Sequence, residues 1–196
     1  AMQHPRAFPL VATRHPAAPW LRPPLRSLDV VEHFLATLTE FGFDDDRVVV
    51  SGFSMGGRGA TRLAMKYPEL FCSLHNQAGN VMHLLDLYDP TKPDVYPNSY
   101  LGPDRARYEE NDVYALITKN AAAIKAGTRI AITCGTRDDG HLPTVRDYHA
   151  ALLAAGIDHT YLEVEGLAHE HDKLVTMYRT TWFDYHAESF RRAAQR

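Results

Sequence analysis

A chain of 196 residues, 45% of them hydrophobic, is long enough to bury one sizeable core, and we expect a single domain over residues 1–196. The formal net charge of −3 provides no strong basic field, so neither a nucleic acid nor an anionic membrane is an expected partner. No apolar run approaches the roughly 20 residues that span a bilayer, and residues 1–10 lack the apolar core of a signal peptide. The cytoplasm is therefore the default location, with secretion left open.

Short β-branched runs alternate along the chain with longer segments of helical period. This alternation predicts an α/β fold, with a mostly parallel sheet covered by helices. In chain order, the expected strands are residues 7–13, 47–51, 72–77, 128–134 and 159–163. The expected helices are residues 28–41, 58–67, 144–156 and a last helix that begins at Asp172. The pattern does not define the order of the strands in the sheet.

Two of these helices carry more specific signals. Thr144 and Asp147 resemble a capping pair at the start of one helix, and Gly156 ends it. The last helix presents an aromatic stripe on one face, which is interpreted as core packing. The stripe consists of Leu174, Tyr178, Trp182 and Tyr185.

Two stretches interrupt the alternation. Residues 4–24 hold half of the chain's twelve prolines and predict one short strand followed by an irregular connection. Residues 80–120 form a long excursion between strands that is punctuated by Asp89-Pro90, Lys92-Pro93 and Tyr96-Pro97. Because long connections in compact domains often serve as lids or binding loops, we expect this segment to be one.

The chain has two cysteines, Cys72 and Cys134, each inside an apolar segment that is expected to be a buried strand. They are interpreted as core thiols, and the alternatives are a disulfide or a reactive thiol. Two cysteines cannot supply a four-thiolate zinc site. Cysteine usage therefore places little constraint on the compartment.

The sharpest motif is a serine flanked by glycines, Gly52-Phe53-Ser54-Met55-Gly56-Gly57, between an expected strand and an expected helix. On a tight strand-to-helix turn the Ser54 hydroxyl is lifted clear of the backbone, and Gly52 and Gly56 remove the Cβ atoms that would collide there. The helix N-terminus also favours developing negative charge, so the Met55 N–H is the expected oxyanion donor. The alternative is a glycine-rich turn that only packs helix against sheet.

A serine hydroxyl needs a base to take its proton and an acid to orient that base. In hydrolases with such a turn the acid and then the histidine follow the serine, each after a later strand. Asp138 and His169 occupy these positions, with Asp139 and His171 as the neighbouring alternatives. The pair His169 and His171 could also bind a metal, but no third ligand is evident, so neither a metal nor another cofactor is expected. The pair Asp139 and His141 is interpreted as loop solvation.

Beyond the serine motif, several segments resemble the esterase family that includes esterase D (S-formylglutathione hydrolase), the antigen 85 group and feruloyl or acetyl xylan esterases. They are residues 66–71, 100–104, 135–139, 148–156 and 165–169, so that the resemblance runs in order over residues 28–172. It implies an α/β-hydrolase fold and a triad of Ser54, Asp138 and His169. The expected activity is hydrolysis of a small-molecule carboxylic ester through an acyl-enzyme.

The chain departs from this family at its N-terminal end. Family members usually carry further strands and a His-Gly loop whose N–H supplies the second oxyanion donor, and no such loop precedes Ser54. We therefore expect an N-terminally shortened domain and a loss of about 3 to 4 kcal/mol of transition-state stabilisation. Three explanations stay open, namely a fragment, a short enzyme with its second donor elsewhere, and an oligomer that covers the open sheet edge. Because a bare strand edge favours association, we expect a homo-oligomer. Peptide or amide hydrolysis and a non-catalytic binding role are the alternative functions.

Overall fold

The computed structural model describes residues 48–92, 95, 97 and 101–195 of the chain. The strand expected at residues 7–13, the irregular connection within residues 4–24 and the helix expected at residues 28–41 lie outside the described residues. All structural statements below refer to the described part.

Four parallel strands form the central sheet. They are β1 (Val49–Phe53), β2 (Ser73–Gln77), β3 (Arg129–Gly135) and β4 (His159–Val164), and they lie in that order. Each neighbouring pair is parallel, with Val49 opposite Ser73, Ser73 opposite Arg129, and Ile130 opposite His159. The predicted parallel sheet is confirmed, although β1 begins two residues later than expected. Because parallel strands all end at one edge, the loops that follow β1, β3 and β4 meet there.

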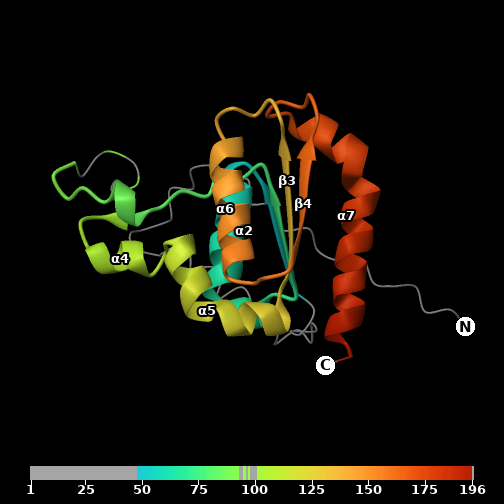
Figure 1. The fold of residues 1–196 in the computed structure, drawn as a ribbon, viewed down its shortest axis with the longest axis horizontal. Coiled ribbons are helices and arrows are strands. Elements are labelled where there is room, and N and C mark those ends of the chain that lie inside the picture. Colours follow the sequence, from blue (N-terminus) through green and yellow to red (C-terminus); the bar gives the residue numbers. More distant parts are fainter. Residues whose placement is uncertain (1–47, 93–94, 96, 98–100, 196) are drawn as a thin grey trace, which may run out of the picture. The chain divides into compact units, whose positions relative to one another are not determined.

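Helices cover both faces of this sheet. The longer ones are α2 (Met55–Lys66), α5 (Val113–Gly127), α6 (Leu142–Ala154) and α7 (His171–Ala193). The short ones are α4 (Arg105–Glu109) and two 3₁₀ turns, η2 (Pro68–Leu70) and η3 (Leu85–Leu87). Figure 1 shows α2 and α6 on one face and α7 on the other. The helices predicted from Arg58, Thr144 and Asp172 are all present.

The start of α6 differs from the prediction. The helix begins at Leu142, its N-cap is His141, and no side-chain hydrogen bond caps it there. The Thr144 hydroxyl instead donates to the His141 carbonyl oxygen at 3.0 Å. The prediction of a Thr144–Asp147 cap is therefore wrong, because Pro143 fits the first turn and lets the helix start earlier.

The segment expected as an excursion contains regular structure in its second half. Asp112 caps α5 by accepting hydrogen bonds from the Tyr114 and Ala115 N–H groups, both at 3.0 Å. From Val113 onward the chain is therefore helix, and it packs against α2. A lid or binding role for residues 80–112 stays a prediction.

The two faces of the sheet are chemically different. Leu74, Ile130 and Ile132 are buried on one face, and Asn76 on the same face donates to the Thr61 hydroxyl of α2 at 2.8 Å. On the other face, under α7, Ser73 hydrogen-bonds His186 at 2.9 Å. The side chains thus alternate between an apolar layer and a polar layer.

The aromatic stripe of α7 packs against the C-terminal part of the sheet, as predicted. Val164, Leu167 and Leu174 form a buried cluster that Tyr178 and Trp182 contact. Cys72 and Cys134 are both buried and form no disulfide, which confirms the interpretation as core thiols.

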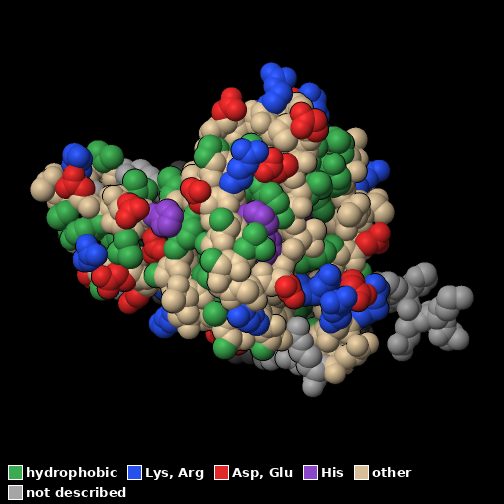
Figure 2. Space-filling model, in the orientation of Figure 1, with side chains coloured by type: hydrophobic (Ala, Val, Ile, Leu, Met, Phe, Trp, Pro, Cys, Tyr) green, Lys and Arg blue, Asp and Glu red, His purple; other side chains and the backbone are tan. Residues whose placement is uncertain are grey.

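No helix of the described residues is both long enough and apolar enough to cross a membrane. On the face seen in Figure 2, positive and negative side chains are interspersed over the described surface. This face therefore carries no extended field of one sign.

The polar layer under α7 makes stability depend on pH. His75 is fully buried and hydrogen-bonds the Thr133 hydroxyl at 2.9 Å. Burial lowers the pKa of His75 to about 3, and burial likewise lowers the pKa of His186 to about 4. Both imidazoles are therefore neutral in the folded protein at pH 5, whereas in the unfolded chain they take up protons below about pH 6.5.

We expect the free energy of unfolding to fall as the pH drops from about 6.5 toward 4, by about 2 kcal/mol per histidine at pH 5. The sign follows because the unfolded chain binds more protons than the folded one throughout this range. Urea unfolding of the wild type and of His75→Gln at pH 7 and pH 5 measures the effect. Between pH 7 and pH 5, the free energy of unfolding of the variant should fall by about 2 kcal/mol less than that of the wild type. An equal fall in both proteins would mean that His75 does not contribute to the pH dependence of stability.

Candidate active site

Ser54 lies on a sharp turn between β1, which ends at Phe53, and α2, which begins at Met55. Its backbone has φ 56° and ψ −122°, in a region that side-chain-bearing residues rarely adopt. The turn is held by a hydrogen bond from the Ser54 N–H to the Gln77 carbonyl oxygen at 2.9 Å. Strained residues of this kind cluster at functional sites, where the surrounding structure maintains them.

The turn requires close backbone contacts, but not at both predicted glycines. A Cβ on Gly52 would lie 2.4 Å from the Gly56 carbonyl carbon, so glycine is required there for space. A Cβ on Gly56 would meet nothing within 4 Å in the described structure, and the prediction for Gly56 is wrong in that respect. The second tight position is Gly57, where a Cβ would lie 2.8 Å from the Gly52 carbonyl oxygen. The reason is that Gly57 is buried, whereas Gly56 is exposed.

The structure brings the three predicted side chains into one hydrogen-bonded row. The His169 Nε2 atom lies 2.8 Å from the Ser54 hydroxyl oxygen, and the His169 Nδ1 atom lies 2.5 Å from an Asp138 carboxylate oxygen. Because the Nδ1–H donates a hydrogen bond to the carboxylate, a neutral His169 has an unprotonated Nε2 that can accept the serine proton. These residues are far apart in sequence, since His169 comes 115 positions after Ser54.

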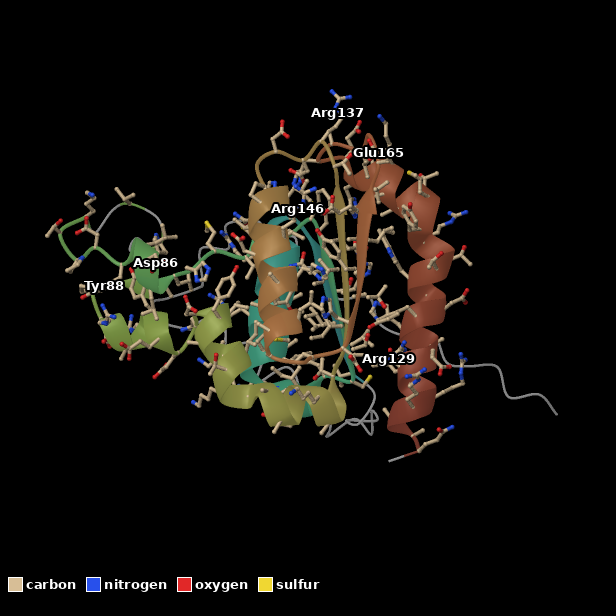
Figure 3. All side chains as sticks on the ribbon, in the orientation of Figure 1. Asp86, Tyr88, Arg129, Arg137, Arg146 and Glu165 are labelled. Carbon is tan, nitrogen blue, oxygen red and sulfur yellow. The ribbon has the colours of Figure 1, made fainter. Side chains whose placement is uncertain are left out.

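The loops that carry Asp138 and His169 are joined by backbone contacts. The Thr136 N–H donates to the Val164 carbonyl oxygen at 3.0 Å, and the Arg137 N–H donates to the Leu167 carbonyl oxygen at 2.9 Å. A Cβ on Gly135 would lie only 2.1 Å from that Leu167 oxygen, so glycine permits this approach. Figure 3 shows Arg137 and Glu165 at this end of the sheet and Arg129 at the opposite end. The acid and the base are thus positioned by rigid strand ends.

The neighbouring alternatives lie elsewhere. Asp138 is 3% exposed, whereas Asp139 is exposed. The His171 side chain is half exposed, with its Nδ1 atom 3.7 Å from Asp172. Its ring lies 4.8 Å from the ring of Phe53. Of the two candidate pairs, the structure therefore joins Asp138 and His169 to Ser54.

One residue of this site was missed from the sequence. The His141 Nδ1 atom lies 2.8 Å from the second carboxylate oxygen of Asp138, and its ring stacks on that of His169 at 4.1 Å with an interplanar angle of 8°. The interpretation of His141 as loop solvation beside Asp139 is therefore wrong. The available signal was its position three residues after Asp138 at the start of a helix, where both side chains share one turn.

The first turn of α2 places the Met55 N–H, the predicted oxyanion donor, next to Ser54. Met55 is the first residue of the helix, and the N–H groups of a first turn have no acceptor within the helix. The macrodipole adds partial positive charge at the same place. The arrangement beside Ser54 is thus suited to a developing negative charge, and the Met55 side chain itself is 74% exposed.

Possible metal ligands in the described structure do not include the pair His169 and His171. Asp138, His141 and His169 form a group whose ligand atoms lie within 4.8 Å of one another. The two imidazoles are stacked almost in parallel, so their in-plane lone pairs lie in separate planes and cannot both point at one ion. A metal ion requires lone pairs that converge on it. The geometry therefore fits two hydrogen bonds to one carboxylate better than metal coordination.

Cys134 is the only cysteine near the site in the described part of the chain. Its sulfur lies 3.9 Å from the Asp138 carboxylate. Burial, together with the negative charge of Asp138, raises the pKa of the Cys134 thiol to about 12. The thiol stays protonated at neutral pH, which excludes it as a competing nucleophile.

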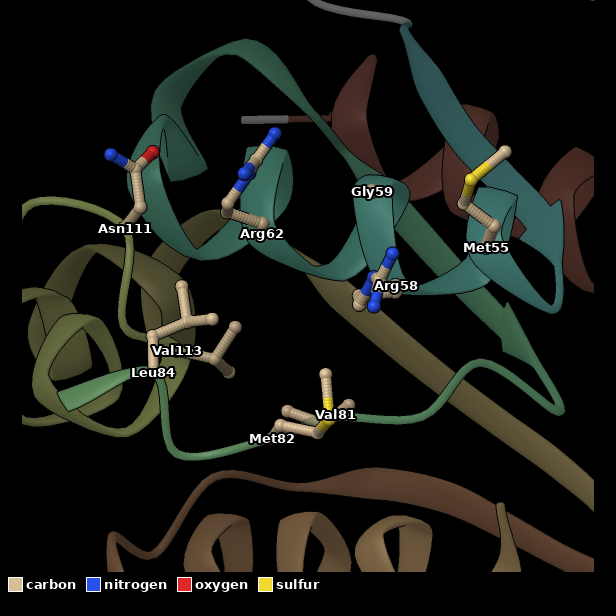
Figure 4. Close-up of a pocket in the computed structure, with 9 residues that line it drawn as sticks. All are labelled: Met55, Arg58, Gly59, Arg62, Val81, Met82, Leu84, Asn111 and Val113. Carbon is tan, nitrogen blue, oxygen red and sulfur yellow. The ribbon is translucent and has the colours of Figure 1, made fainter. Parts of the chain in front are cut away.

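A cavity of about 400 Å³ borders the start of α2 (Figure 4). Its size falls within the range that accommodates small organic ligands. Its walls come from α2, from the segment after β2 and from the start of α5. The lining residues are Met55, Arg58, Gly59, Arg62, Val81, Met82, Leu84, Asn111 and Val113.

Comparison with known proteins assigns the fold and the family. A solved S-formylglutathione hydrolase from Agrobacterium tumefaciens matches with a TM-score of 0.64 and 25% identity, over 82% of this chain and 56% of that one. FphF, a fluorophosphonate-binding serine hydrolase of Staphylococcus aureus, matches with a TM-score of 0.63 and 19% identity, over 79% of this chain and 62% of that one. The fold is that of the α/β-hydrolases.

The sequence comparisons agree. The family model described as "Putative esterase" matches residues 29–176, and the chain belongs to that family. An acetyl esterase of Caldicellulosiruptor saccharolyticus is 31% identical over 136 residues, which is 62% of this chain and 48% of that protein. The chain thus spans about half the length of this curated relative.

Proposed function

We propose that this protein hydrolyses carboxylic esters through an acyl-enzyme formed on Ser54. The observation that carries the proposal is the short row from the Ser54 hydroxyl through His169 to the buried Asp138, with distances of 2.8 Å and 2.5 Å. The strained backbone of Ser54 at the start of a helix supports it, because this conformation presents the hydroxyl beside helix N–H groups.

In the first half of the reaction, the Ser54 oxygen attacks the ester carbonyl carbon while His169 Nε2 takes the serine proton. Asp138 accepts the Nδ1 proton of His169 in a hydrogen bond, which stabilises the imidazolium that forms. The carbonyl oxygen becomes negative, and the Met55 N–H is assigned as its donor. The bond to the alcohol then breaks, and His169 returns the proton to the departing alkoxide.

In the second half, water attacks the acyl carbon and His169 takes a proton from it. The bond between the acyl group and Ser54 breaks, and the serine oxygen recovers a proton from His169. The carboxylic acid leaves, and the enzyme is unchanged. No cofactor takes part in this proposed cycle.

Small acyl groups are the proposed substrates. The acetyl esterase relative supports this choice by similarity. The cavity beside Met55 supplies a mostly apolar space for the acyl or the alcohol part of the ester, with Val81, Met82 and Leu84 on its wall. The proposal for the substrate class can be checked with p-nitrophenyl esters of increasing acyl length.

A fluorophosphonate probe tests the nucleophile directly. We expect the probe to modify Ser54, which a mass increase on the peptide containing Ser54 would report, and Ser54→Ala should remain unmodified. Ser51→Ala is the matched control, since Ser51 is an exposed serine of β1 three residues earlier, and this variant should be labelled like the wild type. Labelling that persists in Ser54→Ala would contradict the proposal.

A further inference from the structure

We infer that His141 is a positioning residue of this site, which acts by holding the carboxylate of Asp138 in the orientation that His169 requires. The inference rests on the proposed function of Ser54, His169 and Asp138. It concerns the hydrogen bond that His141 gives to the carboxylate oxygen of Asp138 that His169 does not use.

The carboxylate of Asp138 is shared between two imidazoles. One oxygen accepts a hydrogen bond from His169 Nδ1 at 2.5 Å, and the other accepts one from His141 Nδ1 at 2.8 Å. The Asp138 side chain is 3% exposed, so water has little access to either oxygen. With His141 absent, one buried oxygen would lose its donor, and the carboxylate would be free to rotate away from His169 to find another.

His141 is itself held firmly. Its N–H donates to the Asp138 carbonyl oxygen at 3.1 Å, and its own carbonyl oxygen accepts hydrogen bonds from the Thr144 hydroxyl and the Val145 N–H, both at 3.0 Å. Because the backbone on both sides is fixed, the imidazole of His141 approaches Asp138 from a defined direction. Such support from a second layer of residues is what maintains an acid–base pair at productive distance.

The ring of His141 also lies flat against that of His169. The ring centroids are 4.1 Å apart, and a third ring, that of Phe53, lies 4.5 Å from His169. These contacts limit the tilt of the His169 imidazole. Two roles of His141 can therefore be separated by substitution, namely the hydrogen bond to Asp138 and the stacking on His169, and we assign the positioning effect to the hydrogen bond.

Two variants separate these roles. His141→Asn keeps an N–H donor close to the place of Nδ1 but removes the ring, whereas His141→Phe keeps a flat ring but removes the donor. With p-nitrophenyl acetate, we expect His141→Asn to retain kcat within about threefold and His141→Phe to lower kcat by about 10- to 100-fold with KM little changed. Neither change removes a helix cap, since the His141 side chain makes no capping hydrogen bond.

The pH profile supplies a readout that a purely structural role would not change. The titratable groups that face Asp138 are Cys134 of β3, His141 before α6 and His169 after β4. Without the His141 donor the carboxylate can rotate away from His169, so that it stabilises a protonated His169 less. The acidic limb of kcat/KM should therefore move to lower pH in His141→Phe and stay in place in His141→Asn.

A measurement without turnover distinguishes failure of this inference from failure of the proposed function. The experiment follows the proton resonance of His169 Nδ1–H by NMR. We expect this resonance to be the same in the wild type and in His141→Asn, and to shift or broaden in His141→Phe. Unchanged kcat, pH profile and resonance in a folded His141→Phe would overturn the positioning role. An equal loss in both variants would also overturn it, because the N–H donor that asparagine keeps would then make no difference. If the fluorophosphonate labelling of Ser54 fails while the resonance behaves as expected, only the proposed function is wrong.

Discussion

Replacing Ser54 with alanine is expected to lower kcat for p-nitrophenyl acetate by about 10⁶-fold, the size of effect found when the nucleophile of a serine hydrolase is removed. The physical reason is that the covalent route disappears. His169 would remain bonded to Asp138 through Nδ1, but its Nε2 atom would have no serine hydroxyl 2.8 Å away to deprotonate. Initial rates of the wild type and the variant over a range of ester concentrations measure the effect.

Alanine suits this test because its backbone preferences at φ 56° are close to those of serine. The variant should therefore unfold at nearly the wild-type temperature, as thermal melts followed by circular dichroism can verify. Full turnover by a folded Ser54→Ala enzyme would contradict the acyl-enzyme mechanism. A loss of activity accompanied by a large fall in melting temperature would instead point to a folding defect. The fluorophosphonate labelling of Ser51→Ala and Ser54→Ala would then decide whether Ser54 is the nucleophile.

The second large effect is expected for Asp138→Asn, with kcat lower by about 10⁴-fold. Asp138 accepts hydrogen bonds from both His169 and His141, whereas asparagine offers one oxygen and one NH₂ group. If the NH₂ group faces His169, that imidazole must carry its proton on Nε2 and can no longer accept the proton of Ser54. If the NH₂ group faces His141, the His141 imidazole must carry its proton on Nε2 instead. The negative charge that stabilises the His169 imidazolium is still missing.

The double variant Asp138→Asn with His141→Phe sharpens this prediction. Once His141 no longer donates, the asparagine can turn its oxygen to His169 without conflict, and the correct tautomer of His169 returns. We therefore expect the double variant to be no less active than Asp138→Asn alone, although both lack the negative charge. Measuring kcat for the wild type, both single variants and the double variant completes the cycle. A single Asp138→Asn variant with wild-type kcat would contradict a role for the carboxylate.

The sequence indicated much of the site because its parts obey local rules. The strand-to-helix context identified Ser54, and the order of acid and base after later strands led to Asp138 and His169. Each of these signals depends on residues close together in the chain. The family assignment from the distributed motifs is confirmed by the match over residues 29–176.

Other features depended on contacts between distant segments. A glycine is required for space at Gly135 because the Leu167 carbonyl oxygen approaches it from the next loop. Gly56 was expected to face a similar contact, but in the described structure its Cβ position is open, and Gly57 has that role instead. No pattern of neighbouring residues reveals which glycine of a pair faces the sheet until the helix is placed.

From its sequence alone, this protein is identifiable as an α/β protein with a parallel sheet, a serine on a turn before a helix, and an acid and a histidine after later strands. Hydrophobic period and turn chemistry determine these features locally. Only the tertiary structure decided that His141 belongs to the site and that Asp138, not Asp139, faces His169. Such choices depend on which side of a loop points inward, and that direction is set by the packing of β3, β4 and α6 against one another.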